Sequence, residues 1–327
     1  MKIQPSNAID RLRFLGLSFP VWALLLALSL VVALDVSRVA AKTVGDDQLR
    51  WNGGEEDLTW PAQLDVAWYD NYADARSRAI ADGRMLFIYF RDAEPNRAQE
   101  AFETTTLANA KVREDLQKYV VVRVSVDEKI DVDGKQIRLI DHGAFAEMGG
   151  HQGIAIVDYL DANSEHYGQV VSAFPFRQGS YYRAHAVSAM LELPEGTLTQ
   201  RTMIFAVRMH PDGPRSTQGE FNPVLAEEAE SHSTYQARIR LQGHHSWDMR
   251  FHRISARLRG GSLPREVVAE SWGGESLVDA CHECVRSWRQ SSGHWGAVRS
   301  PHKMFAFDIK RGSNGVWYAT GIFAEGG

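Results

Sequence analysis

Short apolar runs alternate with helix-like segments in the first half of the 327-residue chain. Residues 85–90 are uniformly apolar, which suits a strand buried on both faces. Residues 119–126 are rich in β-branched side chains, which favour strands. Two further strands are expected at 153–159 and 169–174. Helices are expected at residues 70–82, 97–103, 110–117, 140–148 and 180–193. This order predicts a mixed α/β sheet covered by helices.

The pattern changes at residues 194–197, where proline and glycine indicate a loop. We therefore expect two domains, 62–194 and 200–327. The apolar run at 203–208 predicts a strand. Residues 224–241 predict a helix that ends at Gly243, because glycine is a frequent C-terminal cap. The residues expected to share one face of this helix recur at three- and four-residue steps: Leu225, Ala229, His232, Gln236 and Ile239.

The remaining C-terminal segments also alternate between strand and helix patterns. Residues 267–272 form a short apolar run, and 275–289 have helical composition. Two aromatic-rich strands are expected at 304–309 and 316–323, joined by a turn at 312–315. The second domain is therefore also expected to be α/β.

The N-terminus carries an export pattern. Arg11 and Arg13 precede an uncharged run at residues 14–34, and small residues follow at Val39-Ala40-Ala41. This is typical of a signal peptide, although the run is long enough to span a bilayer. A cleaved signal peptide and a retained transmembrane anchor over residues 1–41 therefore both remain open. Either one places the rest of the protein outside the cytoplasm, as a periplasmic, extracellular or membrane-anchored protein.

Composition narrows the function classes. Hydrophobic residues make up 44% and charged residues 24%, which is typical of a globular protein and not of a disordered chain. The net charge of -5 disfavours nucleic acid as a partner, because phosphate neutralisation dominates that binding. Two cysteines are too few for a disulfide-stapled fold. The polar, glycine-rich residues 42–61 are expected to be a linker.

The order of elements over 62–193, with Trp68, Ala75 and Phe90 at its opening, resembles the thioredoxin fold. That family carries a redox Cys-x-x-Cys directly after its first core strand, where a helix N-terminus lowers the thiol pKa. Here residues 92–96 contain no cysteine. Gln152-Gly153 also stands where the family has a cis-proline. The resemblance therefore implies a redox-inactive scaffold.

The second half carries four features in a characteristic order. A His-bearing helix leads to a Gly-x-His segment, a strand has a glutamate near its end, residues 288–294 read Trp-x-x-Ser-x-Gly-His, and the closing strand is aromatic. This order resembles the CAP superfamily (cysteine-rich secretory, antigen 5 and pathogenesis-related proteins), which has an α/β/α sandwich. Its cleft holds two histidines and two acids. The resemblance carries these over to His244 (or His245, if the loop differs by one), Glu270 and His294, while Ser291 replaces the second acid.

Such a cleft supports several kinds of chemistry. Two imidazoles and a carboxylate can bind a divalent metal such as zinc, or act as a general base. They can also hydrogen-bond one another and stiffen the cleft. The resemblance implies binding of a lipid, a sterol or an envelope protein more often than catalysis. We therefore expect a non-catalytic binding or scaffolding protein of the cell envelope, with a metal-assisted hydrolase using His244, Glu270 and His294 as the alternative.

Cys281-His282-Glu283-Cys284 allows three further readings. The cysteines could be buried thiols, a disulfide, or zinc ligands together with His282 or His294. A disulfide would make the protein a thiol-disulfide oxidoreductase, the second alternative function. The favoured reading is buried thiols, because one helical face would hold both cysteines and two apolar neighbours against the sheet. Those neighbours are Leu277 and Trp288.

Overall fold

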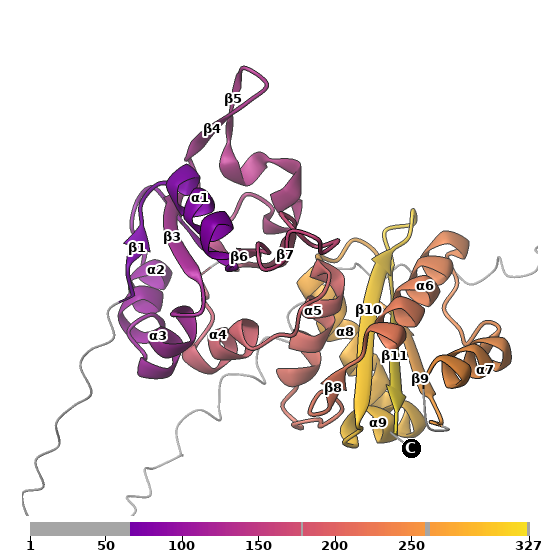
Figure 1. The fold of residues 1–327 in the computed structure, drawn as a ribbon. Coiled ribbons are helices and arrows are strands. Elements are labelled where there is room, and N and C mark those ends of the chain that lie inside the picture. Colours follow the sequence, from indigo (N-terminus) through magenta and orange to yellow (C-terminus); the bar gives the residue numbers. More distant parts are fainter. Residues whose placement is uncertain (1–65, 178, 259–261, 326–327) are drawn as a thin grey trace, which may run out of the picture. The chain divides into compact units, whose positions relative to one another are not determined.

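A computed structural model describes residues 66–177, 179–258 and 262–325 (Figure 1). The expected leader at 1–41 and linker at 42–61 lie outside the described residues. Within the described residues, no helix is long and apolar enough to cross a membrane. The mixed α/β class expected from the sequence is confirmed, since the described residues form two larger sheets covered by helices, together with a separate two-stranded hairpin.

The first sheet has five strands in the order β1-β3-β2-β6-β7. Strands β1, β3 and β2 run parallel, whereas β6 is antiparallel to both β2 and β7. Central β2 is buried almost throughout, as its uniformly apolar sequence predicts. The bounds are β1 Trp68–Tyr69, β2 Leu86–Arg91, β3 Val120–Ser125, β6 Gly153–Val157 and β7 Val170–Pro175.

Four of the five helices expected around this sheet are present as α-helices. The first begins after Asn71, whose side chain accepts from the Asp74 amide, and ends at Gly83 with φ +59°. The segment expected at 140–148 is two short 3₁₀ helices instead of one α-helix. The bounds are α1 Tyr72–Asp82, α2 Arg97–Ala101 continuing as a π-helix Phe102–Thr106, α3 Ala110–Leu116, α4 Ala184–Leu191, and the 3₁₀ helices Leu139–Asp141 and Gly143–Met148.

A hairpin that the sequence analysis did not predict lies between β3 and β6. It consists of β4 (Lys129–Val132) and β5 (Lys135–Arg138), paired antiparallel. Asp133 and Gly134 join the strands with φ values of +53° and +78°. A two-residue hairpin turn with positive φ at both positions commonly has the sequence Asp-Gly. This pair was therefore the feature of the sequence that could have indicated the hairpin.

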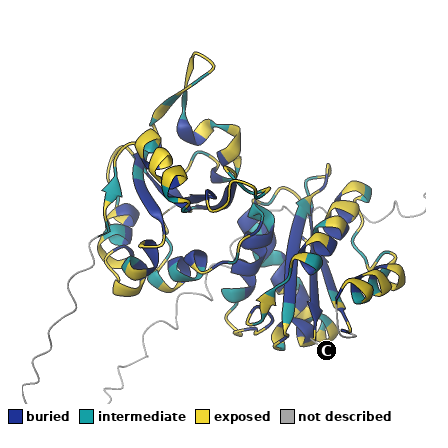
Figure 2. Cartoon of the chain, in the orientation of Figure 1, coloured by how far each residue is buried: buried dark blue, intermediate teal, exposed yellow. Residues whose placement is uncertain are grey.

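The prediction of a strand at 203–208 is wrong. These residues belong to α5 (Leu198–Arg208), which begins with a capping box between Thr197 and Gln200. The helix is buried on nearly all sides (Figure 2) because it packs against both larger sheets. Arg201 Nε donates to Ser172 Oγ of β7 at 3.0 Å, and Thr199 Oγ1 donates to the Asp308 carboxylate of the second sheet at 2.6 Å. A helix that is buried on all sides has no polar face, so its sequence lacks the periodic pattern of an amphipathic helix. Its apolar run therefore resembles that of a buried strand.

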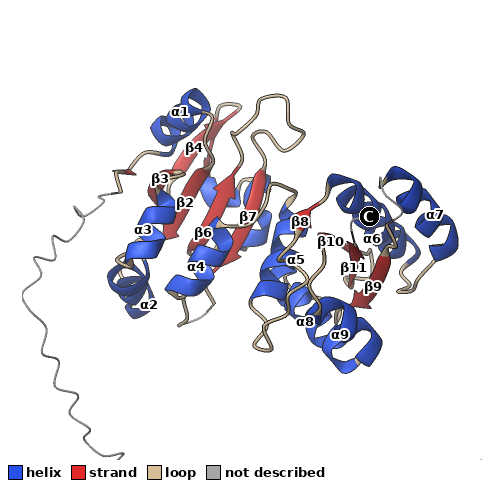
Figure 3. Cartoon of the chain, turned by 60° about the horizontal axis from the view of Figure 1, so that its bottom comes forward, coloured by secondary structure: helices blue, strands red, loops and turns tan. Residues whose placement is uncertain are grey.

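The second sheet has four strands in the order β8-β10-β11-β9. Helices α6 and α7 cover one face, and α5, α8 and α9 cover the other (Figures 1 and 3). The sequence analysis did not predict α7, α9 or the short β8. The bounds are β8 Glu220–Phe221, α6 Pro223–Ile239, α7 Trp247–Arg257, β9 Arg265–Glu270, α8 Leu277–Gln290, α9 Ser292–Arg299, β10 Met304–Arg311 and β11 Trp317–Ala324.

Of the two expectations about helices α6 and α8, the first is wrong and the second is confirmed. Helix α6 does not end at Gly243; its C-cap is Arg240, which adopts the left-handed conformation at φ +58°. The expected buried face of α8 is confirmed, because its four members lie in the core against β9, β10 and β11. These members are Leu277, Cys281, Cys284 and Trp288.

Candidate functional site

Two histidines separated by 50 residues meet beside strand β9. His244 lies in the connection between α6 and α7, and His294 lies in the first turn of α9. Their Nε2 atoms are 3.4 Å apart, and the ring centroids are separated by 5.6 Å. The His244 side chain remains 43% exposed, so the pair is accessible to solvent and to ligands.

The carboxylate of this cluster is Glu266, and not the Glu270 expected from the sequence. Glu266 Oε1 lies 2.9 Å from Nδ1 of His244, and its side chain is 1% exposed. Glu270 is exposed and lies at the other end of β9, about 13 Å further along at 3.3 Å per residue. Glu266 and Glu270 are four residues apart, so both side chains point to the same face of β9. The alternation of side chains along a strand therefore does not indicate which of the two contacts His244.

Arg250 of α7 holds Glu266 in place. Its guanidinium forms an ion pair with Oε2 of Glu266 and also donates from Nε to the His245 carbonyl at 3.2 Å. Burial opposes ionisation of Glu266, but the hydrogen bonds from His244 and Arg250 outweigh it and lower the carboxyl pKa. Glu266 is therefore a buried anion that orients His244. Sequence reasoning missed Arg250 because the helix that carries it was not predicted.

A third histidine secures the loop that carries His244. His232 is 2% exposed, and its Nε2 donates to the Gly243 carbonyl at 2.9 Å. The same nitrogen lies 3.9 Å from Glu266 Oε1. Burial lowers the His232 pKa to about 4, so this imidazole is neutral at pH 7. Its place on the buried face of α6 was predicted, but its contact with the site was not.

His245, the alternative to His244, has a different environment. Its ring packs 5.6 Å from the ring of Tyr235, and its Nε2 donates to the Leu241 carbonyl at 3.3 Å. Among the described residues, the partner of His294 is thus His244. Ser291, which stands where the resembled family has its second acid, is the residue before α9 and supplies no carboxylate.

The geometry allows a hydrogen bond between the paired imidazoles. If Nδ1–H of His244 donates to Glu266, its Nε2 is free to accept from Nε2–H of His294. Burial lowers the pKa of His294, and the nearby His244 lowers it further. A lower pKa favours the neutral imidazole that this hydrogen bond requires. The cluster can accept a proton or hydrogen-bond a polar ligand.

The donor set for a metal is incomplete. Nowhere in the described ranges do three or more histidine, cysteine, aspartate or glutamate side chains converge as metal ligands. The predicted set of His244, Glu270 and His294 is therefore not assembled. The two imidazole nitrogens are nevertheless separated by roughly the 3.3 Å expected for two ligands on a tetrahedral zinc ion. Glu266 would then orient one ligand from the second shell.

Both cysteines are free and fully buried. Burial, followed by the charges of neighbouring groups, raises the pKa of each thiol well above its ordinary value. The disulfide considered above is absent, and neither His282 nor His294 completes a metal site with them among the described residues. Their position matches the favoured reading, in which they act as small apolar core residues.

The buried His232 predicts a specific pH dependence of stability. Its pKa is about 4 in the folded protein and 6.5 ordinarily, so between these values the unfolded state binds a proton that the folded state does not. The free energy of unfolding should therefore fall from pH 6.5 to pH 5, by up to about 1.4 kcal/mol per pH unit. Urea unfolding of wild type and His232→Gln at each pH measures this. An equal slope in both proteins would contradict the assignment.

Comparison of the chain with protein-family models, curated proteins and solved structures gives no match. Its function must therefore be argued from the geometry of its own residues.

Proposed function

We propose that this chain is an exported cell-envelope protein in which a thioredoxin-like scaffold carries a CAP-like binding module. The strand order β1-β3-β2-β6-β7, in which β6 runs antiparallel to β2 and to the edge strand β7, supports the first half of this proposal. The segment after β2 has no cysteine, and the described residues contain no cis peptide bond. This part therefore lacks the groups that perform thiol exchange.

The paired imidazoles carry the proposed binding function. His244 and His294 come from distant segments, face each other at 3.4 Å and are oriented by a buried carboxylate. This is a preorganised polar site open to solvent, and among the described residues neither imidazole is hydrogen-bonded to a serine or cysteine side chain. Such an arrangement suits recognition of a polar head group better than covalent catalysis.

Large apolar side chains are exposed in the segments that carry the imidazole cluster, and they favour an amphiphilic ligand. Leu241 and Met249, on either side of His244 in the chain, are 57% and 70% exposed. Leu263, three residues before Glu266, is 67% exposed. Large apolar side chains exposed together typically mark a binding surface. We therefore propose a membrane lipid or sterol, with its polar head at the imidazoles and its apolar part on these side chains.

Vesicle co-sedimentation tests this proposal. We expect saturable binding of the protein to phosphatidylethanolamine–phosphatidylglycerol vesicles, with or without added sterol, and weaker binding by the His244→Ala/His294→Ala double variant. His252→Ala, an exposed histidine of α7, serves as the matched control and should bind as wild type does. Absence of binding to every vesicle, or equal binding by the double variant, would contradict the proposal.

A metal-assisted hydrolase is the second candidate, and the distance between the two Nε2 atoms favours it. His244 and His294 would hold a zinc ion, which would supply an activated water. Metal analysis after equilibration with zinc should then show one bound ion in wild type and none in His294→Ala. Equal metal content in both proteins, or no hydrolysis of model esters by the zinc-loaded protein, would refute this candidate.

Thiol-disulfide exchange is not supported by the structure, since reactive cysteines need exposure and thiolate character. Cys281 and Cys284 have neither. We expect no reaction of either thiol with Ellman's reagent in the folded protein, and two equivalents in denaturant without reductant. Rapid reaction in the native state, or fewer than two thiols after unfolding, would contradict this.

A further inference from the structure

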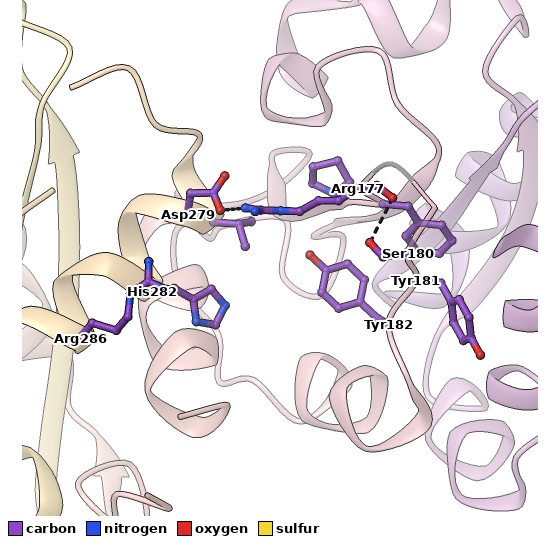
Figure 4. A pocket seen from close by; sticks show the side chains of 10 residues that line it. Arg177, Ser180, Tyr181, Tyr182, Asp279, His282 and Arg286 are labelled. Atoms are coloured by element: carbon purple, nitrogen blue, oxygen red, sulfur yellow. Dashed lines mark hydrogen bonds and ion pairs between the residues drawn. The ribbon is translucent and has the colours of Figure 1, made fainter. Parts of the chain in front are cut away.

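A cleft whose lining includes none of the imidazole-site residues lies between the segment after β7 and helix α8 (Figure 4). Its volume is about 240 Å³. Figure 4 shows Arg177, Tyr182 and His282 directed toward the same space from these two segments. The side chains that line it include those of Phe176, Arg177, Tyr182, Val278, His282 and Arg286.

Two polar groups in this cleft lack partners. Among the described residues, neither the His282 ring nitrogens nor the Tyr182 hydroxyl makes a hydrogen bond. Burial, and then the nearby guanidinium groups of Arg286 and Arg177, lowers the His282 pKa to about 4. Burial raises the Tyr182 pKa to about 12. At pH 7 both groups are therefore neutral, and each has an N–H or O–H to offer a ligand.

Two guanidinium groups add positive charge at the edge of the cleft. Arg177 forms an ion pair with Asp279, and Arg286 donates from Nε to Glu283 at 2.9 Å. Both arginine side chains are more than half exposed. Exposed ion pairs are weak, so an incoming anion can replace a protein carboxylate with little loss.

Together these features point to a ligand of one chemical class. We propose that the cleft binds a small organic carboxylate with a planar apolar body. Arg177 and Arg286 bind the carboxylate, the Tyr182 hydroxyl and the His282 N–H donate to it, and Phe176 and Val278 contact the ring. The volume is below the range typical of drug-sized ligands, so the ligand is about one ring in size.

Benzoate is the probe for this site, with uncharged benzamide as its comparison. In an NMR titration of the full chain, benzoate should shift the His282 ring and Val278 methyl signals saturably, and benzamide should bind at least about tenfold more weakly. Arg177→Gln/Arg286→Gln should weaken benzoate binding at least about tenfold. Asp279→Asn, which frees Arg177, should strengthen it about threefold. Arg289→Gln, on the same helix but paired with Asp212, should leave it unchanged.

Three results would overturn the proposal. Equal affinity for benzoate and benzamide in wild type would show that no carboxylate is recognised. Absence of saturable shifts at His282 and Val278 would show that the cleft is not a site for this class. Weaker binding by Asp279→Asn would show that the Arg177 ion pair supports the ligand instead of competing with it.

Discussion

Glu266→Gln should lower the free energy of unfolding by about 3 kcal/mol or more, because it leaves the buried Arg250 guanidinium without its counterion. Gln also keeps only one acceptor oxygen, so it can accept from His244 or from Arg250 but not from both. Gln has nearly the same volume as Glu, so the loss reflects charge and not packing. Urea unfolding at pH 7 measures the effect.

Glu270→Gln is the matched control for this prediction. It makes the same chemical change on the same face of β9, but at an exposed position. Its effect should be within about 0.5 kcal/mol. Similar effects of the two substitutions, or a larger effect at Glu270, would show that the carboxylate has been assigned to the wrong end of the strand.

Trp288→Ala should destabilise the protein by about 3–5 kcal/mol. Trp288 is fully buried on α8, and its ring lies 5.8 Å from that of Phe307 in β10. Truncation to alanine leaves a cavity between helix and sheet that the surrounding side chains cannot fill. Thermal or urea unfolding, followed by circular dichroism, measures the loss.

Trp272→Ala tests whether burial, and not residue type, causes this effect. Trp272 is 71% exposed in the loop after β9. Its indole N–H donates to Glu283 at 3.2 Å, an exposed hydrogen bond of little energetic value. We expect a change within about 0.5 kcal/mol. A change at Trp272 as large as that at Trp288 would contradict the described packing.

Strand β2 and the one-sided helix α8 were predictable from sequence. The apolar run of β2 and the buried face of α8 follow directly from their periodicities. The turn from α1 into β2 was readable from Gly83. In these segments local propensity and tertiary environment favour the same structure.

Prediction failed where the tertiary environment overrides the local pattern. Helix α5 reads as a strand because both of its sides are buried, and its Thr197 capping box was the unused signal. The choice between Glu266 and Glu270 depends on where α7 places Arg250, which no local rule specifies. The pairing of His244 with His294 was anticipated from the family resemblance, not from their spacing.

His244 and His294 face each other beside Glu266, and NMR titration of the histidine ring signals tests this arrangement most directly. We predict that His294 titrates below its ordinary pKa of 6.5. In His244→Gln its pKa should rise, because the neighbouring imidazole no longer opposes its protonation, while His252→Gln should leave it unchanged. A His294 pKa of 6.5 or higher in wild type, unaffected by His244→Gln, would show that the two imidazoles do not meet.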